Sequence, residues 1–321
     1  MLTALTFAVA LVVGLLLTPI VRHFAHNFDL LDQPGGRKVH RVPIPRLGGM
    51  AMALAFGVAL GMATILSPDL GAVDVLQPPN RLGPILAAVT LLCVVGFVDD
   101  TRGMRASVKL GFQVGAALLA YGLGLRLEQF HVPWGIVELG PLALPITVAW
   151  IVGVINAVNL IDGLDGLASG VVLTVLGAFG LLAAADGVDP TLLIVVATVG
   201  AAIGFLAYNL HPASIIMGDT GSMFLGFVVA AIGISLTQDG IRPLPPWIPI
   251  IAVGLPIVDT LWAVIRRTAR GDAVFTPDRG HIHHQLLRAG LSQRDAMLTL
   301  TAVSAALAII AVILADRVIP R

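Results

Sequence analysis

The chain has 321 residues, of which 57% are hydrophobic and 12% are charged, and its formal net charge is +0. Soluble domains carry about 25% charged residues, so most of this protein's surface cannot face water. The balanced charge excludes a nucleic-acid-binding protein with a basic face. The single cysteine, Cys93, lies in an apolar run, which excludes a disulfide framework and a cysteine-based zinc site. We therefore expect an integral membrane protein.

Apolar runs long enough to span a bilayer, about 17–25 residues each, recur along the whole chain. They fall at 3–21, 47–66, 82–98, 107–124, 142–160, 167–185, 190–208, 221–237, 246–265 and 298–316. The first run lacks the basic start of a cleaved signal peptide, so we expect it to be a membrane span. The sequence predicts an all-α polytopic membrane protein with about ten transmembrane helices, forming a single domain over 1–321.

The loops between these runs divide into two sets by parity, and one set holds most of the positive charge. With Lys109 it carries 14 of the 19 Lys and Arg residues and comprises 22–46, 99–106, 161–166, 209–220 and 266–297. The positive-inside rule makes this side cytoplasmic and leaves both termini on the other side. On the outer side, alternating residues around Pro133-Trp134-Gly135 predict a small β-hairpin within 125–141.

Two adjacent carboxylates, Asp99 and Asp100, end the apolar run GFVDD. Such a pair costs desolvation and mutual repulsion at a membrane boundary, and the simplest interpretation is a helix end that reaches water. Arg102, Arg105 and Lys109 follow within ten residues. Carboxylates hold a metal ion or orient a nucleophile, and cations bind phosphate oxygens, so the pattern favours a magnesium–phosphate site.

Oxygen-bearing side chains recur at every third residue in NAVNLIDGLDG: Asn156, Asn159, Asp162 and Asp165. A regular α-helix rotates such a row by about 60° per step, so the four share a face only if the helix tightens or breaks. The two glycines of the motif favour a break. The structural alternative is a capped helix–turn–helix, but two of these side chains suffice for magnesium, which retains waters.

The eighth run opens with Met217-Gly218-Asp219-Thr220-Gly221-Ser222. Asp219 and Ser222 both suit a helix N-cap, which is the structural alternative for this motif. Free backbone N–H groups at a helix start also bind anions, and an aspartate there is a good metal ligand. We expect Asp219 to belong to the functional site.

The longest cytoplasmic loop contains Asp278-Arg279-Gly280-His281-Ile282-His283-His284. Adjacent histidines rarely complete a tetrahedral zinc site without further ligands, so zinc is disfavoured. Imidazoles that donate hydrogen bonds to phosphate or sugar hydroxyls fit better beside Arg279, and the structural alternative is an interfacial histidine-rich loop.

Two further features are ambiguous when taken alone. The basic segment RKVHRVPIPRLGG, which includes His40 and Arg46, indicates only membrane orientation or attraction to anionic lipid. Asp259, near the inner end of the ninth run, is a candidate partner for Arg266 or Arg267, which would be a structural role.

Together, these strings resemble the polyprenyl-phosphate N-acetylhexosamine-1-phosphate transferases, a family that includes the WecA, TagO and MraY types. The matching strings are RKVHRVPIPRLGG, GFVDD with Lys109, NAVNLIDGLDGLASG, GDTGSMFLG, GLPIVDTLW and the HIHH loop. The resemblance implies transfer of a sugar 1-phosphate from a UDP-N-acetylhexosamine to a membrane polyprenyl phosphate, with release of UMP. It also implies Mg²⁺ or Mn²⁺ as cofactor, a homodimer, and an active site on the cytoplasmic face of the cell membrane.

The resemblance also assigns a role to each motif by position. Asp99 and Asp100 match the catalytic acidic pair, and Lys109 matches the lysine that contacts the pyrophosphate. Asn159 and Asp219 match the metal ligands, and Asp162 and Asp165 match the acidic pair of the nucleotide-site loop. The remaining predicted binding residues are the histidine motif, His281, His283 and His284, together with Arg279, Arg46 and His40.

The strings PRLGG and HIHH resemble the WecA and TagO types, whose donor is UDP-GlcNAc. The MurNAc-pentapeptide enzymes carry three consecutive histidines, whereas Ile282 interrupts the histidines here. We therefore expect N-acetylglucosamine 1-phosphate transfer, a first membrane step of a cell-wall or surface glycan pathway, with phospho-MurNAc-pentapeptide transfer as the alternative. A transporter would place its charges near the midplane rather than at one interface, and a lipid or nucleotide sensor would bind without forming product.

A phosphate monoester has a second pKa near 6, so the lipid phosphate is mostly dianionic at pH 7. It needs positioning and charge neutralisation more than a strong base. We expect direct in-line attack on the β-phosphorus, with Asp99 or Asp100 orienting the lipid phosphate, and a covalent aspartyl-phosphate remains the alternative.

Overall fold

The computed structural model describes residues 1–35, 42–67, 82–184, 190–238, 243–271 and 280–318. Its helices are α1 (Leu2–Asn27), α2 (Gly48–Leu66), α4 (Leu82–Arg102), α5 (Ala106–Gly122), α6 (Ala143–Ile161), α7 (Leu167–Ala184), α8 (Pro190–Asn209), α9 (Gly218–Gln238), α10 (Trp247–Ala252), α11 (Gly254–Ala269), α12 (Ile282–Arg288) and α13 (Gln293–Val318). The predicted all-α polytopic class is confirmed.

In the part of the chain that the structure describes, two small antiparallel sheets and one 3₁₀ turn accompany the helices. Strand β1 (Leu31–Asp32) pairs with β2 (Ile44–Pro45), and the 3₁₀ turn η1 (Gly140–Leu142) leads into α6. Strand β3 (Gln129–Val132) pairs with β4 (Gly135–Glu138), with Val132 opposite Gly135 across the Pro133-Trp134 turn. The hairpin predicted within 125–141 is therefore confirmed.

Within the described residues, eight helices are long and apolar enough to cross a membrane: α1, α2, α4, α6 with η1, α7, α8, α9 and α13. The run predicted at 107–124 forms α5, which is shorter, with 17 residues. The run predicted at 246–265 is divided into α10 and α11 at Val253. Pro256 explains the break, because it offers no N–H to the carbonyl of Ala252 and its ring crowds that carbonyl. The count of ten spans stays a prediction.

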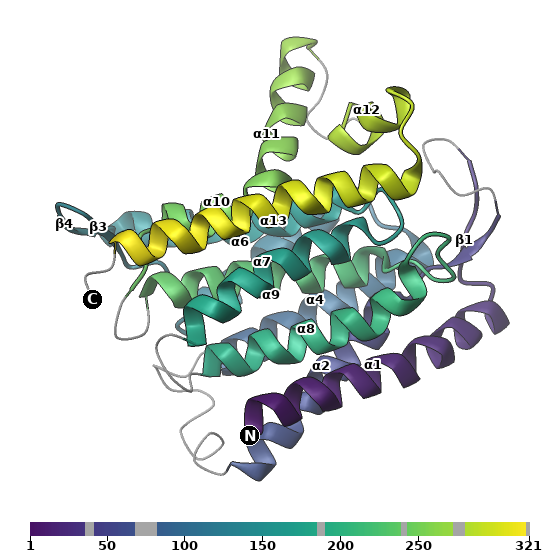
Figure 1. The fold of residues 1–321 in the computed structure, drawn as a ribbon, viewed down its shortest axis with the longest axis horizontal. Coiled ribbons are helices and arrows are strands. Elements are labelled where there is room, and N and C mark those ends of the chain that lie inside the picture. The colour runs from purple at the N-terminus through teal and green to yellow at the C-terminus, as the bar shows by residue number, and fades with distance from the viewer. Residues whose placement is uncertain (36–41, 68–81, 185–189, 239–242, 272–279, 319–321) are drawn as a thin grey trace.

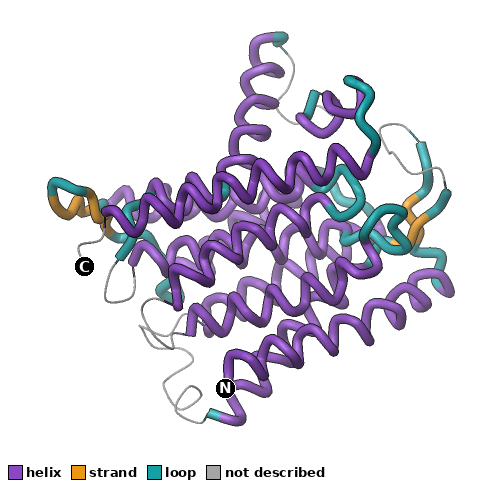
Figure 2. The backbone as a smooth tube through the Cα atoms, in the orientation of Figure 1, coloured by secondary structure: helices purple, strands orange, loops and turns teal. Residues whose placement is uncertain are grey.

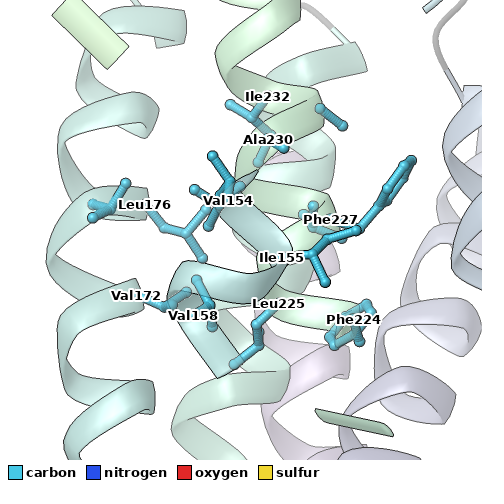
Figure 3. Close-up of a cluster of buried hydrophobic side chains, with 14 of the residues drawn as sticks. Val154, Ile155, Val158, Val172, Leu176, Phe224, Leu225, Phe227, Ala230 and Ile232 are labelled. Carbon is cyan, nitrogen blue, oxygen red and sulfur yellow. The ribbon is translucent and has the colours of Figure 1, made fainter. Parts of the chain in front are cut away.

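Helix α9 is the centre of the bundle, and every residue from Gly218 to Thr237 is buried. It packs mainly against α6 and α4, with α2, α7 and α8 completing its surroundings. Figure 3 shows α6 side chains such as Val154 and Ile155 interlocking with Phe224 and Phe227 of α9. Small residues let membrane helices approach closely, which is how such helices associate in lipid.

The two ends of the bundle differ. Figure 1 shows the start of α1 and the end of α13 on the same side of the bundle as the β3–β4 hairpin, whereas β1 lies at the opposite end. Figure 2 shows loops gathered around β1 and β2 at that opposite end. Helix α11 stands out from the bundle, with α12 beside it (Figure 1). The polar motifs lie at the β1–β2 end.

Candidate active site

Four helices and one loop bring five charged side chains and one amide together at the β1–β2 end. The contributors are Asp99 and Asp100 from the end of α4, Lys109 from the start of α5, Asn159 from the end of α6, Asp219 from the start of α9, and Arg46 from the loop after β2. We call these six residues the acidic cluster. All six were predicted from the sequence as site residues, and the structure places them in contact.

Close backbone contacts fix the helices that carry the acidic cluster. A Cβ atom on Gly96 of α4 would lie 2.5 Å from the Cα of Thr220 in α9, and one on Gly49 of α2 would overlap the backbone of Gly221. Only glycine permits such approaches without displacing a backbone. The loop after β2 is also joined to the segment before α9, since the N–H groups of Gly48 and Gly49 donate to the carbonyls of residues 216 and 217.

Both carboxylate oxygens of Asp100 accept hydrogen bonds from the start of α9. Its Oδ1 accepts a hydrogen bond from the backbone N–H of Asp219 at 2.8 Å. Its Oδ2 accepts from the N–H and the hydroxyl of Thr220 at 3.0 and 2.7 Å. The Nε of Arg46 lies 3.1 Å from Oδ1. A carboxylate at a helix N-terminus is stabilised by the helix dipole and the free N–H groups. Asp100 thus acts as the anchor of α9.

Asp99 and Asp219 share one cation. The Nζ of Lys109 lies 2.6 Å from Oδ2 of Asp99 and 2.7 Å from Oδ2 of Asp219. The other oxygen of Asp219 accepts a hydrogen bond from Nδ2 of Asn159 at 2.6 Å. Arg46 approaches Asp219 as well, with Nη2 at 3.4 Å from Oδ2. The cluster therefore alternates negative and positive groups, as a phosphate-handling site requires.

Arg46 is the one cluster member that lies outside the helices. Partial burial by itself disfavours the charged guanidinium, but the carboxylates of Asp100 and Asp219 outweigh that cost. The pKa of Arg46 is therefore raised, and the side chain carries a permanent charge toward the cluster. An arginine held in this way is suited to bind phosphate oxygens.

The metal-binding capacity of the cluster rests on oxygen ligands. Within the part of the chain that the structure describes, no three His, Cys, Asp or Glu side chains are arranged to hold a metal ion by themselves. Magnesium needs only one or two carboxylates, with water and substrate phosphates completing its octahedron. Asp99 and Asp219 meet that need, because both already contact a single cation, the ammonium of Lys109. The residues present therefore fit a hard divalent cation.

The loop from 162 to 166 lies between α6 and α7, as the break expected in NAVNLIDGLDG requires. Asp162 is half-buried, and it is close enough to the acidic cluster for the charges there to affect its pKa. Burial, followed by the negative charges of Asp219 and Asp100, raises the pKa of Asp162 to about 8. A carboxyl that keeps its proton near neutral pH donates a hydrogen bond as well as accepting one.

Asp165 has a different environment from Asp162. Its Oδ2 lies 2.8 Å from Nδ1 of His211 and accepts a hydrogen bond from the backbone N–H of Ala213 at 3.1 Å. The adjacent N–H of Gly166 donates to the side chain of Asn209 at 3.0 Å. These contacts tie the loop to the segment that precedes α9. Asp165 therefore braces the loop in this structure.

Asn156, the first residue of the three-residue row, also has a structural contact. Its Nδ2 donates to Oε1 of Gln113 in α5 at 2.7 Å. Gln113 is buried, so the pair satisfies polar groups at the α5–α6 interface.

The predicted histidine motif forms a second group, which we call the histidine cluster: His281, His283 and His284 at the start of α12. The rings of His281 and His283 stack with centroids 5.8 Å apart, and those of His283 and His284 lie 4.3 Å apart. Burial and the neighbouring histidines lower the pKa of His283 to about 4, so its ring is neutral at physiological pH. A Cβ atom on Gly163 would overlap this ring, so the histidine cluster packs directly on the 162–166 loop.

Two predicted binding residues, His40 and Arg279, lie outside the described residues. Several residues with clear contacts were not predicted, namely Gln113, Asn209, His211 and Thr220. A single amide in an otherwise apolar run was the available signal for Gln113. Asp259 was expected to pair with Arg266 or Arg267, and the structure shows its carboxylate against His281 at 2.9 Å.

Comparison with known proteins agrees with this geometry. Residues 82–237 match the model of glycosyl transferase family 4. The chain is 37% identical to the probable undecaprenyl-phosphate N-acetylglucosaminyl 1-phosphate transferase of Bacillus subtilis, over 98% of this chain and 85% of that protein. It is 33% identical to the decaprenyl-phosphate N-acetylglucosaminephosphotransferase of Mycobacterium leprae, over 92% of this chain and 79% of that protein.

A third relative is the undecaprenyl-phosphate alpha-N-acetylglucosaminyl 1-phosphate transferase of Escherichia coli K12. It is 30% identical, over 91% of this chain and 78% of that protein. These likenesses extend over almost the full chain and include every element that contributes to the acidic cluster. The protein is therefore a multi-pass membrane phosphosugar transferase that belongs to glycosyl transferase family 4.

Proposed function

We propose that the protein transfers N-acetylglucosamine 1-phosphate from UDP-GlcNAc to a polyprenyl phosphate and releases UMP. The observation that carries this proposal is the acidic cluster, in which two carboxylates share Lys109 at 2.6 and 2.7 Å beside Arg46 and Asn159. The three relatives described above are all named for the transfer of an N-acetylglucosamine phosphate to a polyprenyl phosphate, which supports the same transferred group and acceptor.

Asp99 and Asp219 are the residues that would hold Mg²⁺, with Asn159 beside them. The ion supplies charge neutralisation for the diphosphate and for the developing charge on the leaving phosphate. The carboxylates of this pair are within reach of a common cation, which supports the assignment.

The chain's own residues position the two phosphates. An oxygen of the dianionic lipid phosphate attacks the β-phosphorus of UDP-GlcNAc, a P–O bond forms, and the bond to the α-phosphate oxygen breaks as UMP leaves. Asp100 has both oxygens occupied by donors, so Asp99 is the carboxylate that orients the lipid phosphate, which attacks as the dianion and needs no base. Lys109 and Arg46 neutralise the diphosphate oxygens. This assignment favours direct attack over an aspartyl-phosphate intermediate.

An apolar groove supports a lipid acceptor. It has a volume of about 280 Å³ and lies between α6 and the α10–α11 pair, where Trp150, Val154, Ala157, Ile257 and Leu261 line it. Ala157, which lines the groove, lies two residues before Asn159 in α6, near the helix end that carries the acidic cluster. A polyprenyl chain that lies in the groove would bring its phosphate to Asp99 with little loss of conformational freedom at the reacting end.

The site is proposed to face the cytoplasm in the cell membrane. The motif loops lie at the end opposite the start of α1 and the end of α13 (Figure 1), and the loops assigned to that end, with Lys109, carry 14 of the 19 Lys and Arg residues. The positive-inside rule and the cytoplasmic supply of nucleotide sugars both favour this orientation. Ten membrane passes and a homodimer are part of the same proposal, and native mass spectrometry in detergent tests the dimer.

One assay tests the function. Purified protein is incubated with undecaprenyl phosphate, Mg²⁺ and either UDP-GlcNAc or UDP-MurNAc-pentapeptide, and UMP is measured. We expect release with UDP-GlcNAc alone, and loss of release when EDTA removes the metal. Release only with the second donor contradicts the sugar assignment. Release with neither donor contradicts the transferase, and flux of a solute into proteoliposomes without turnover would favour a transporter.

Asp99→Asn gives a sharper test of the proposed mechanism. It retains the shape of the side chain but removes the charge that orients the lipid phosphate, so turnover should fall by about 10²–10³-fold. The matched control is Asp295→Asn, because Asp295 is an exposed aspartate at the start of α13 that contacts Ser292. Labelled phosphate bound covalently to the wild-type protein after quenching would contradict direct attack.

A further inference from the structure

A buried hydrogen-bonded pair, Asp259 and His281, lies away from the acidic cluster, between α11 and the start of α12. Oδ2 of Asp259 lies 2.9 Å from Nδ1 of His281, and Oδ1 accepts a hydrogen bond from the backbone N–H of Ile282 at 2.9 Å. The exposed fraction of the Asp259 side chain is 2% and that of His281 is 6%. Both oxygens of Asp259 are thus used to hold the first residues of α12.

The chemistry of this pair fixes the orientation of the His281 ring. An ionised carboxylate only accepts hydrogen bonds, so Nδ1 of His281 must carry the proton. In the neutral ring, Nε2 is then the hydrogen-bond acceptor. A carboxylate that orients a histidine in this way is a recurring arrangement in enzymes that position an imidazole toward a substrate.

The rest of the histidine cluster connects this pair to the loop that carries Asp162. The ring of His283 stacks on His281 at 5.8 Å and lies against Gly163. Its Nδ1 is buried without a hydrogen-bond partner among the described residues. A buried ring nitrogen with no partner is costly unless a ligand or water uses it. The Nε2 side of this ring faces Gly163, so the histidine cluster lies directly against the loop that carries Asp162.

We propose that Asp259 is a positioning residue, which holds His281 and α12 so that the histidine cluster closes over the 162–166 loop and binds the nucleotide-sugar donor. The proposal rests on the proposed function for the identity of the donor. Asp259 itself contacts neither phosphate, and it acts through His281. The lipid phosphate binds at the acidic cluster, so the effect of Asp259 should be confined to the donor.

A double-mutant cycle tests whether Asp259 acts through His281. Asp259→Asn keeps the size of the side chain but weakens both hydrogen bonds, and should raise KM for UDP-GlcNAc about tenfold. KM for undecaprenyl phosphate should change less than twofold. In a His281→Gln background, adding Asp259→Asn should change KM for UDP-GlcNAc less than twofold, because residues that act as a unit are not additive.

Two further measurements separate positioning from a general structural role. The melting temperature in detergent should be the same for Asp259→Asn as for the control Asp295→Asn, and Asp259→Glu, which keeps the carboxylate, should recover most of the affinity for the donor. If Asp259→Asn does not fold, the comparison of Asp259→Glu with the wild type in both KM values makes the same test. A lowered affinity for the lipid, or additive effects in the cycle, would overturn the proposal.

Binding of UMP by calorimetry keeps this inference distinct from the proposed function. We expect Asp259→Asn to weaken UMP or UDP-GlcNAc binding by about the same factor as KM, in the absence of lipid. If the wild-type protein releases no UMP in the transfer assay, the proposed function fails, but this binding comparison still tests the positioning role. Equal binding by the wild type and the variant contradicts that role.

Discussion

The acidic cluster and the histidine cluster differ in how many elements hold them. The acidic cluster is built from the ends of α4, α5, α6 and α9 and from the loop before α2, and close backbone contacts at Gly49 and Gly96 fix these elements. The histidine cluster begins a seven-residue helix, α12, that Asp259 anchors beside the protruding α11. Reactive phosphates need fixed geometry, whereas a donor must enter and leave. The many elements that hold the acidic cluster suit the fixed geometry of the reacting phosphates, and the short α12 with its one anchor suits a donor site that must open and close.

The largest effect should come from removing the charge at the centre of the acidic cluster. Asp219→Ala leaves Lys109 and Arg46 without a shared partner and removes the hydrogen bond from Asn159. We expect turnover to fall by at least about 10³-fold, and the residual activity to depend less on Mg²⁺ concentration. UMP release over a range of Mg²⁺ measures both. Turnover within tenfold of the wild type would show that the cluster is not the reaction centre.

Gly96→Ala tests the packing that supports the acidic cluster. The new Cβ would lie 2.5 Å from the Cα of Thr220, so α4 and α9 must separate and the bonds from Asp100 to α9 must lengthen. Overpacking of this kind costs about 1–3 kcal/mol, and we expect more than a tenfold loss of turnover with a lower melting temperature. The matched control is Gly57→Ala in α2, where a Cβ meets nothing within 4 Å.

Gly163→Ala makes the corresponding change at the histidine cluster, and its effect should be smaller. The new Cβ would overlap the ring of His283, but that ring belongs to the short α12 and can shift without moving a core helix. We expect KM for UDP-GlcNAc to rise about threefold to tenfold, with little change in turnover number. An effect on turnover as large as that of Gly96→Ala would erase the proposed contrast between the two clusters.

The sequence predicted the acidic cluster better than the histidine cluster for a physical reason. The bundle brings together the helix ends on one side of the membrane. Polar residues at those ends, such as Asp99 and Asp219, avoid the hydrocarbon core and were therefore expected to lie close together at that end. The separate contacts of Asp99 and Asp100 could not be predicted from the sequence. Only the structure shows that Asp100 binds Thr220 and that Asp99 shares Lys109 with Asp219.

The partner of Asp259 was harder to predict. His281 is 22 residues away in sequence, and the contact depends on where the chain turns after Pro256. The sequence predicted one continuous run over 246–265, whereas the structure breaks it before Pro256, and the direction of α11 follows from that break. For a similar reason, the contact between His211 and Asp165 follows from the path of the segment before α9, which periodicity does not encode.

The smallest effect is a pH dependence of stability that comes from His283 in the histidine cluster. Burial and the neighbouring histidines lower the pKa of His283 to about 4, below the value near 6.5 of an exposed histidine. Between those two pH values the unfolded chain binds more protons at this residue than the folded protein, so His283 makes stability fall as pH falls from about 6.5 to 4. His283→Phe keeps a ring that cannot be protonated, and its melting temperature in detergent should therefore decline less than that of the wild type over this range. Parallel melting curves for the two proteins would show that the ring of His283 is not neutral and buried as the structure has it, and that the histidine cluster is as open to solvent as an ordinary surface loop.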